Sequence, residues 1–197
     1  MRKLIVGLVA GAALAVAACG QSGQPAHHAS RPTPRPHASS PVQASARTVP
    51  VRLRIPAISV DSTVEQVGVD ANGDMGVPKQ LGDVAWYSPG VAPGQSGDAV
   101  IAGHKDDVAG DHGVFWSLGD VKVGDELVVV GQGGAKVKFK VDRVRTVAAD
   151  ANTAQLGLFA KDGPPRLSLI TCTGQTNAQR TAYLQRMVVD ASYDGKA

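Results

Sequence analysis

The sequence predicts a mostly β domain, a barrel or sandwich of about eight short strands, placed behind an N-terminal leader and a tether. Apolar and polar residues alternate with a period of two from position 49 onward, and Gly, Pro, Asp and Asn supply turn signals roughly every ten residues. Helical periodicity is almost absent. Of the 197 residues, 149 follow position 48, which is enough for a self-sufficient hydrophobic core.

The expected strands are residues 51–55, 63–67, 84–87, 98–102, 126–130, 135–142, 144–147, 166–171 and 183–189. The segments 126–130 and 135–142 are expected to form a hairpin that turns through the glycine-rich residues 131–134. A phosphate loop is the alternative for these glycines, but no helix and no Lys-Ser/Thr pair follows them. In its second strand Val137, Phe139 and Val141 share the face that is expected to be buried. Residues 114–118 and 152–160 are expected to form a helical turn or two.

Positive charge is concentrated near the N-terminus. Five basic residues precede position 49 without a single acidic one, so the remaining chain carries 15 Lys and Arg against 17 Asp and Glu. The predicted domain therefore has a formal charge of −2, although the whole chain has +3. This distribution disfavours a broad phosphate-binding face, and we expect no nucleic-acid partner.

Residues 1–18 are predicted to be a lipoprotein-type signal peptide. Arg2 and Lys3 precede an apolar run that reaches Ala18 and is short for a membrane-spanning helix. Residues 16–19 (Val-Ala-Ala-Cys) resemble the bacterial lipobox, whose cysteine is lipidated and becomes the new N-terminus. Cys19 is therefore the expected lipidation site, and its lipid would hold the protein at the extracellular face of the cell membrane. An uncleaved membrane anchor is the alternative.

Residues 19–48 are a tether rich in Pro, Ala, Ser and His, without the apolar periodicity that a core needs. His27, His28 and His37 have no carboxylate or thiolate nearby, so we interpret them as solvated rather than metal-binding. The expected organisation is thus a leader, this tether and one domain over residues 49–197.

Cys172 is the candidate nucleophile of the domain. It ends the apolar run 167–171 and precedes the turn-forming residues 173–175. A single cysteine can also be a small buried hydrophobe. Its expected position at a strand end favours chemistry, and an exported protein that keeps a free thiol risks oxidation unless the thiol has a use.

A thiol needs a partner to react near neutral pH, because its free pKa is about 8.5. Within residues 49–197 only His104 and His112 are available. His104 follows the apolar segment 98–102 through a glycine and is the better candidate, while His112 lies in a polar loop. The loop 104–112 also holds three aspartates, which could form a metal site with these histidines. Their spacing matches neither an EF-hand nor a zincin helix, so we interpret them as solvated charge and expect no metal or cofactor.

A thiol that attacks a carbonyl creates an oxyanion, which a guanidinium can stabilise. Arg186 precedes the apolar end of the last expected strand, and Arg180 lies in the polar connection before it. The residue pattern alone leaves both arginines as candidates.

Together these residues resemble the sortases, cysteine transpeptidases of the Gram-positive cell surface. The Thr-Cys pair that ends residues 168–172 resembles the sortase signature, and residues 102–104 (Ala-Gly-His) resemble the strand end that carries the catalytic histidine. Residues 51–58, the Trp-Tyr pair 86–87 and residues 113–125 are similar to the actinobacterial sortases of class F, or of the related class E. The likeness runs in order through nearly all of residues 50–191.

The resemblance implies a closed β-barrel of about eight strands with short helices, and a transpeptidase activity. Cys172 would attack the Thr-Gly bond of a Leu-Pro-x-Thr-Gly-like sorting signal on a secreted protein, and an amine of a cell-wall peptidoglycan precursor would resolve the thioacyl intermediate. His104 would transfer protons, and Arg186 would hold the substrate or the oxyanion.

The sequence departs from the class F pattern near two of these residues. Thr173 stands where many members have glycine, and Arg186 lies two positions beyond the family's place, which keeps it on the same strand face. The rival hypothesis, from another functional class, is a non-catalytic envelope lipoprotein that binds a wall or protein ligand, with Cys172 as a structural thiol.

Overall fold

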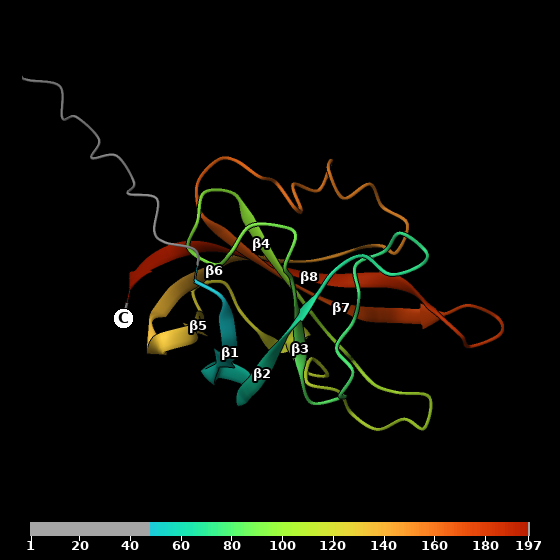
Figure 1. Cartoon of the computed structure of the whole chain (residues 1–197). Coiled ribbons are helices and arrows are strands. Elements are labelled where there is room, and N and C mark those ends of the chain that lie inside the picture. Colours follow the sequence, from blue (N-terminus) through green and yellow to red (C-terminus); the bar gives the residue numbers. More distant parts are fainter. Residues whose placement is uncertain (1–47, 197) are drawn as a thin grey trace, which may run out of the picture. The chain divides into compact units, whose positions relative to one another are not determined.

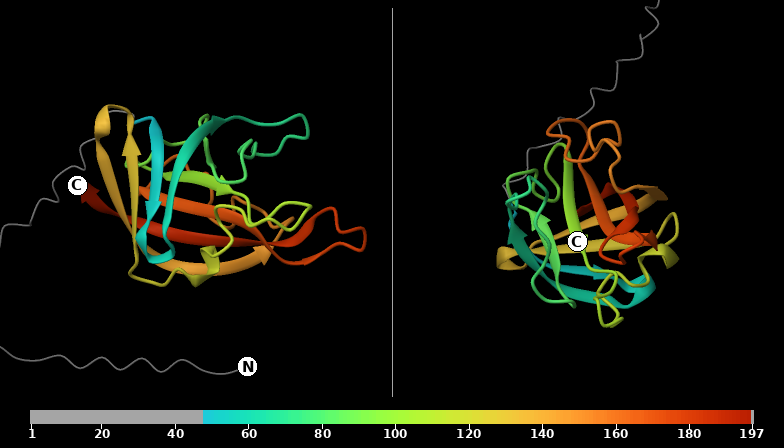
Figure 2. Two further views of the ribbon diagram at one scale, coloured as in Figure 1. Left: turned by 90° about the horizontal axis from the view of Figure 1, so that it is seen from below. Right: turned by 90° about the vertical axis from the view of Figure 1, so that its right-hand side faces the viewer.

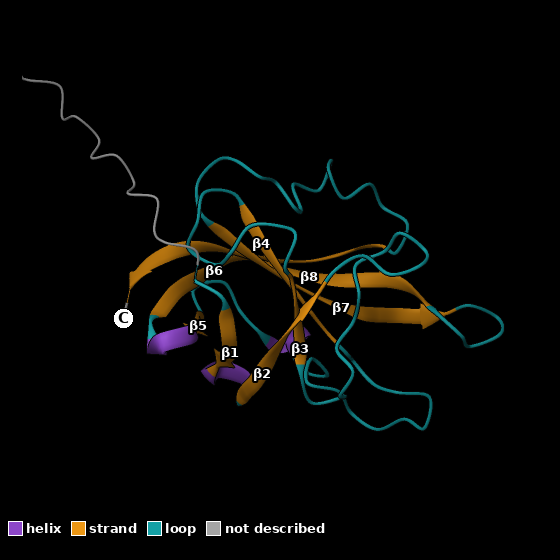
Figure 3. Cartoon of the chain, viewed as in Figure 1, coloured by secondary structure: helices purple, strands orange, loops and turns teal. Residues whose placement is uncertain are grey.

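The computed structural model describes residues 48–196. Cys19, the expected leader and nearly all of the expected tether lie outside these residues. The described strands and short 3-10 helices are β1 (Pro50–Ile55), η1 (Pro56–Ile58), β2 (Val60–Val67), β3 (Val84–Tyr87), β4 (Asp98–Gly103), η2 (Leu118–Asp120), β5 (Glu126–Gly131), η3 (Gln132–Gly134), β6 (Lys136–Ala148), β7 (Arg166–Thr176) and β8 (Tyr183–Lys196) (Figures 1 and 3). Within residues 48–196 no helix has the length and apolar character needed to cross a membrane.

The eight strands close into a barrel in the order β1-β2-β3-β4-β7-β8-β6-β5. The pairs β2–β3 and β4–β7 are parallel, and the other neighbours are antiparallel. The prediction of a mostly β, closed barrel of about eight strands with short helices is therefore confirmed. Residues 114–117 form turns that lead into η2, close to the helical turn expected there.

Strand alternation builds the core as the sequence predicts. In β6, Val137, Phe139 and Val141 are buried, and the hairpin with β5 turns through η3, where Gly133 has a positive φ of 80°. The interior is filled by large apolar side chains that are fully buried, among them Leu53, Ile55, Trp86, Ile101, Phe115, Leu127, Leu167 and Leu169. Val64 of β2 and Val189 of β8 belong to the same buried cluster, so all eight strands share one core.

Two predicted elements have the wrong extent or type. Residues 135–142 and 144–147 belong to one strand, β6, because pairing with β8 continues across a register shift between Val141 and Arg143. Residues 152–160 form turns instead of a helix. Gly157 and Phe159 have positive φ values of 75° and 61° there, and this left-handed backbone interrupts any right-handed helix.

The connections that bear on function gather near one end of the barrel. Figure 2 shows the β2–β3 connection and the β7–β8 hairpin reaching beyond the strands in the same direction. The β6–β7 connection, residues 149–165, runs along the outside of the barrel (Figure 1).

Candidate active site

The candidate active site lies on the outer face of the sheet formed by β4, β7 and β8. Successive residues of a strand point to opposite faces, so the neighbours of the core residues Ile101, Leu169 and Val189 point outward. A cavity of about 430 Å³ opens over this face. Its floor is lined by Ala102, Gly103, His104, Ile170, Thr171, Cys172, Arg186 and Val188.

Cys172 lies inside β7, and the expectation that it ends a strand is wrong. Antiparallel pairing with β8 continues as far as Thr176, so residues 173–175 are strand instead of turn. A register shift between Thr173 and Thr176 and the positive φ of 77° at Gly174 absorb the turn-forming sequence as a bulge. The free thiol is half-buried and borders the cavity.

Arg186 lies directly opposite Cys172 in the β7–β8 register, which places both side chains on the same face. Its Nη1 donates to the main-chain carbonyls of Tyr183 and Gln185, both at 3.1 Å. A guanidinium has five N–H donors, so Arg186 keeps donors for a carbonyl in the cavity. Arg180, the rival, is exposed in the β7–β8 turn and does not border the cavity.

His104 follows the last residue of β4. Its Nε2 lies 2.9 Å from the carbonyl oxygen of Pro78, and because a carbonyl only accepts, this contact assigns the proton of the neutral ring to Nε2. The main-chain N–H of Phe115 donates to the His104 carbonyl at 2.9 Å. A Cβ atom at Gly113 would lie 2.3 Å from the same carbonyl oxygen, so only glycine allows this approach.

A buried hydrogen bond joins the strands that carry the thiol and the imidazole. Thr171, 5% exposed, donates from Oγ1 to the Gly103 carbonyl at 2.9 Å. Thr171 precedes Cys172, and Gly103 precedes His104. The bond therefore fixes the spacing of the two candidate catalytic residues at a point where the parallel β4–β7 pairing has ended.

The loop after His104 is anchored to the start of β8. Tyr183 donates from its hydroxyl to Asp106 Oδ2 at 2.6 Å, and this bond to a carboxylate, together with burial, raises the pKa of Tyr183. Lys105 Nζ lies 3.3 Å from the same hydroxyl and 4.4 Å from the centre of the Trp116 ring. His112 stacks on Trp116 with the ring centres 3.6 Å apart, outside the cavity lining.

The metal alternative for this loop lacks a donor set. Nowhere in the part of the chain that the structure describes do three His, Cys, Asp or Glu side chains gather closely enough to hold a metal ion.

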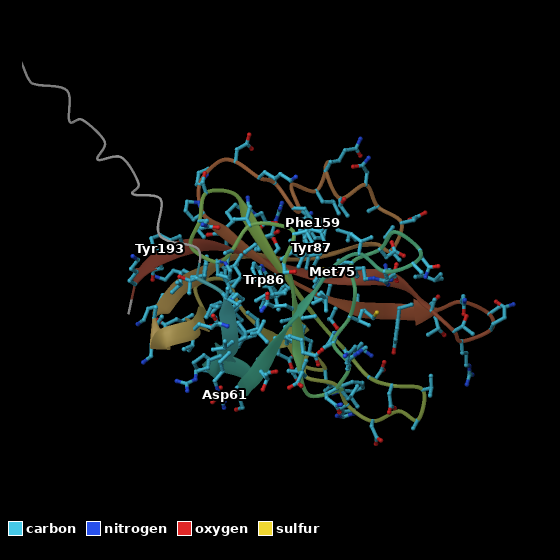
Figure 4. The ribbon with its side chains drawn as sticks, viewed as in Figure 1. Asp61, Met75, Trp86, Tyr87, Phe159 and Tyr193 are labelled. Atoms are coloured by element: carbon cyan, nitrogen blue, oxygen red, sulfur yellow. The ribbon has the colours of Figure 1, made fainter. Side chains whose placement is uncertain are left out.

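Two connections form the cavity walls, and neither is predicted from the sequence to line the site. Asp70, Asp74, Met75 and Val77 come from the β2–β3 connection, and Leu156, Leu158 and Phe159 come from the β6–β7 connection. Figure 4 shows Phe159 beside Tyr87, and the two rings meet edge to face at 5.1 Å. The signal available in the sequence was the apolar group at 156–159, interrupted by Gly157 and interpreted as a helical turn.

A comparison with protein families matches the sortase domain to residues 53–194. The chain belongs to the sortase family. Solved sortase structures share its fold, although no curated protein matches its sequence. Sortase A from Corynebacterium diphtheriae aligns with a TM-score of 0.56 and 24% identity over 76% of this chain and 62% of that one. Sortase C1 from Streptococcus agalactiae aligns with a TM-score of 0.55 and 23% identity over 75% and 69% of the two chains.

Sortase A from Listeria monocytogenes aligns with a TM-score of 0.56 and 17% identity, over 77% of this chain and 90% of that one. The present chain therefore covers less than two thirds of the Corynebacterium diphtheriae structure, but nearly all of the Listeria monocytogenes structure. At these identities the likeness establishes a sortase barrel, and the chemistry has to be argued from the residues themselves.

Proposed function

We propose that this sortase is a cysteine transpeptidase of the cell envelope. The observation that carries the proposal is the gathering of His104, Cys172 and Arg186 on the floor of one cavity. These side chains supply a nucleophile, a proton carrier and a cationic donor, the three groups that acyl transfer through a thioester requires.

The proposed reaction has two acyl transfers. His104 takes the proton of the Cys172 thiol, the sulfur attacks the threonine carbonyl of a sorting signal, the C–N bond to glycine breaks, and His104 gives that proton to the departing amine. An amine of a peptidoglycan precursor then loses a proton to His104 and attacks the thioester; the C–S bond breaks, and the sulfur of Cys172 takes the proton back from His104. Because Nε2 of His104 donates to Pro78, we assign the exchanged proton to Nδ1. Arg186 donates to the carbonyl oxygen as negative charge develops on it.

The proposed substrate is a secreted protein with a Leu-Pro-x-Thr-Gly-like signal. Apolar side chains on both walls of the cavity, Met75 and Val77 on one side and Leu158 and Phe159 on the other, suit an aliphatic peptide segment. Within the sortase family we propose class F, or the related class E, from the residues quoted above.

Incubation of the full chain with a fluorogenic Leu-Pro-x-Thr-Gly peptide, with and without an added amine, tests this function. We expect cleavage that depends on Cys172 and a peptide–amine product when the amine is present. Cleavage that persists in a folded Cys172→Ala variant would reject the enzyme. Absence of cleavage, with a thiol inert to alkylating reagents, would favour the non-catalytic lipoprotein.

We also propose that the chain is exported and held at the extracellular face of the membrane by a lipid on Cys19. The lipobox-like residues 16–19 support this. Cys19→Ser should leave the leader uncleaved and the protein without lipid by mass spectrometry. Identical processing and membrane retention of the variant and the unaltered protein would favour an uncleaved anchor.

A further inference from the structure

A buried polar cluster lies on the same outer face of the sheet as Cys172 and Arg186, four residues along each strand. Ser168 pairs with Asp190 in the β7–β8 register, and Asp98 begins the neighbouring strand β4. Asp98, Ser168 and Asp190 are each no more than 2% exposed. Ser168 donates to Asp98 Oδ1 at 2.9 Å. Burial of two carboxylates costs free energy, so this arrangement needs compensating contacts and a structural reason.

Arg145 of β6 links this cluster to the cavity wall. Its guanidinium binds Asp190 with two hydrogen bonds, Nε to Oδ2 at 2.8 Å and Nη2 to Oδ1 at 3.0 Å. The same Nη2 donates to the Leu156 carbonyl at 2.9 Å. The hydrogen bonds and charges of Arg145 and Arg143 outweigh the effect of burial and hold the pKa of Asp190 below its usual value. Arg145 is thus a fixed, charged donor aimed at the β6–β7 connection.

Asp98 holds the same connection three residues further on. Its Oδ2 accepts from the Phe159 main-chain N–H at 3.3 Å, and its own N–H donates to the Ala160 carbonyl at 2.8 Å. Phe159 has a φ of 61°, a left-handed backbone conformation that is strained for a bulky residue. Its ring rests on Tyr87 of β3 (Figure 4). A strained residue stays in place only where its surroundings hold it, and the surroundings here are Asp98 and Tyr87.

We propose that Arg145 and Asp98 are positioning residues that hold residues 156–159, the wall segment, in place as a preformed side of the substrate cavity. Leu156, Leu158 and Phe159 line that cavity. Arg145 and Asp98 contact the wall segment from behind and do not line the cavity. This inference rests on the proposed function. Residues 152–160 contain no helix or strand of their own, so the barrel has to supply the order that peptide binding requires.

Arg145→Lys tests the proposal, because a lysine keeps the charge beside Asp190 but cannot bind Asp190 through two bonds and Leu156 at once. We expect KM for the Leu-Pro-x-Thr-Gly peptide to rise at least ~10-fold, with kcat changed less than about threefold, as expected for lost substrate binding. Arg143→Lys is the matched control. Arg143 also bonds to Asp190, at 3.1 Å, but has no hydrogen bond to the wall segment, so the KM of this variant should stay within about twofold of the original.

Two variants at Asp98 provide an independent pair. Asp98→Asn keeps an acceptor for the Phe159 N–H, whereas Asp98→Leu removes it, so only the leucine variant should show the raised KM. Alkylation of Cys172 by a small reagent such as iodoacetamide should proceed at the original rate in every variant, because that reagent does not need the wall.

Amide hydrogen exchange at residues 156–159 separates this inference from the proposed function. Exchange should speed up at least ~10-fold in Arg145→Lys and Asp98→Leu, but not in Arg143→Lys, whether or not the peptide is a substrate. Equal exchange in Arg145→Lys and Arg143→Lys would overturn the inference. So would a loss in kcat at unchanged KM in Arg145→Lys. An unaltered protein that cleaves no peptide, with exchange changed as expected, would reject the proposed function alone.

Discussion

Replacing Asp98 by asparagine should make the protein more stable at neutral and alkaline pH. Burial raises the pKa of Asp98 from 3.8 to about 6, partly offset by the Ser168 hydrogen bond and by the charge of Arg166. The folded state therefore holds the Asp98 proton more tightly than the unfolded state does. Stability from this group is complete below pH 3.8 and is lost as the pH rises through about 6.

The magnitude follows from the size of the pKa change. A difference of about two units, at 1.36 kcal/mol per unit, corresponds to ~3 kcal/mol in the free energy of unfolding. Asparagine has nearly the same shape, keeps an acceptor and carries no charge at any pH. Asp98→Asn should therefore gain stability relative to the unaltered protein as the pH rises from 4 to 8, up to that amount.

Urea denaturation of both proteins at several pH values between 4 and 8 measures this difference directly. Only the difference counts, because other titrating groups such as Asp190 are common to both proteins. Asp162→Asn, which removes an exposed carboxylate, is the matched control and should change stability by less than about 0.5 kcal/mol. A difference between Asp98→Asn and the unaltered protein that does not vary with pH would refute the reasoning.

The remaining predictions concern the groups around the thiol. His104→Ala should lower kcat/KM by roughly 10²–10⁴, the usual contribution of a general acid and base, while His112→Ala should change it little. Equal losses in the two variants would instead favour a metal site in the loop 104–112. Gly113→Ala should cost about 1–3 kcal/mol in thermal denaturation and lower kcat, because a Cβ there collides with the His104 carbonyl; an unaltered Tm would contradict this. Arg186→Lys should lower kcat/KM about 10²–10³-fold at unchanged Tm, and a large loss confined to Arg180→Lys would transfer the role.

The strands could be predicted because their signals are local, and Cys172, the candidate nucleophile, borders the cavity. The alternation of Val137, Phe139 and Val141 and the turn glycines of the β5–β6 hairpin fix elements within a few residues, and the structure has both. The strand end at Cys172 was predicted wrongly for the opposite reason. Gly174 is a turn signal in isolation, but pairing with distant β8 residues overrides it and turns it into a bulge.

The cavity walls depend on long-range contacts that no local pattern reveals. The Phe159 N–H is held by Asp98, 61 residues earlier in the chain, and the Leu156 carbonyl accepts a hydrogen bond from Arg145. Neither Asp98 nor Arg145 belongs to a recognisable sequence motif, and the spacing of an aspartate in the sequence does not show whether its carboxylate is buried. The parallel pairing of β4 with β7 brings Asp98 and Ser168 together, and this pairing is known only from the closed barrel.

The most direct test of the central claim is the mass of the full chain during turnover. We would incubate it with a Leu-Pro-x-Thr-Gly peptide, quench with acid, and map the modified residue by peptide sequencing in the mass spectrometer. We expect an acyl adduct on Cys172 and nowhere else, with the mass of the peptide up to its threonine. This adduct should disappear when an amine is added before the quench. Peptide cleavage without any adduct on Cys172, or an adduct on another residue, would contradict it.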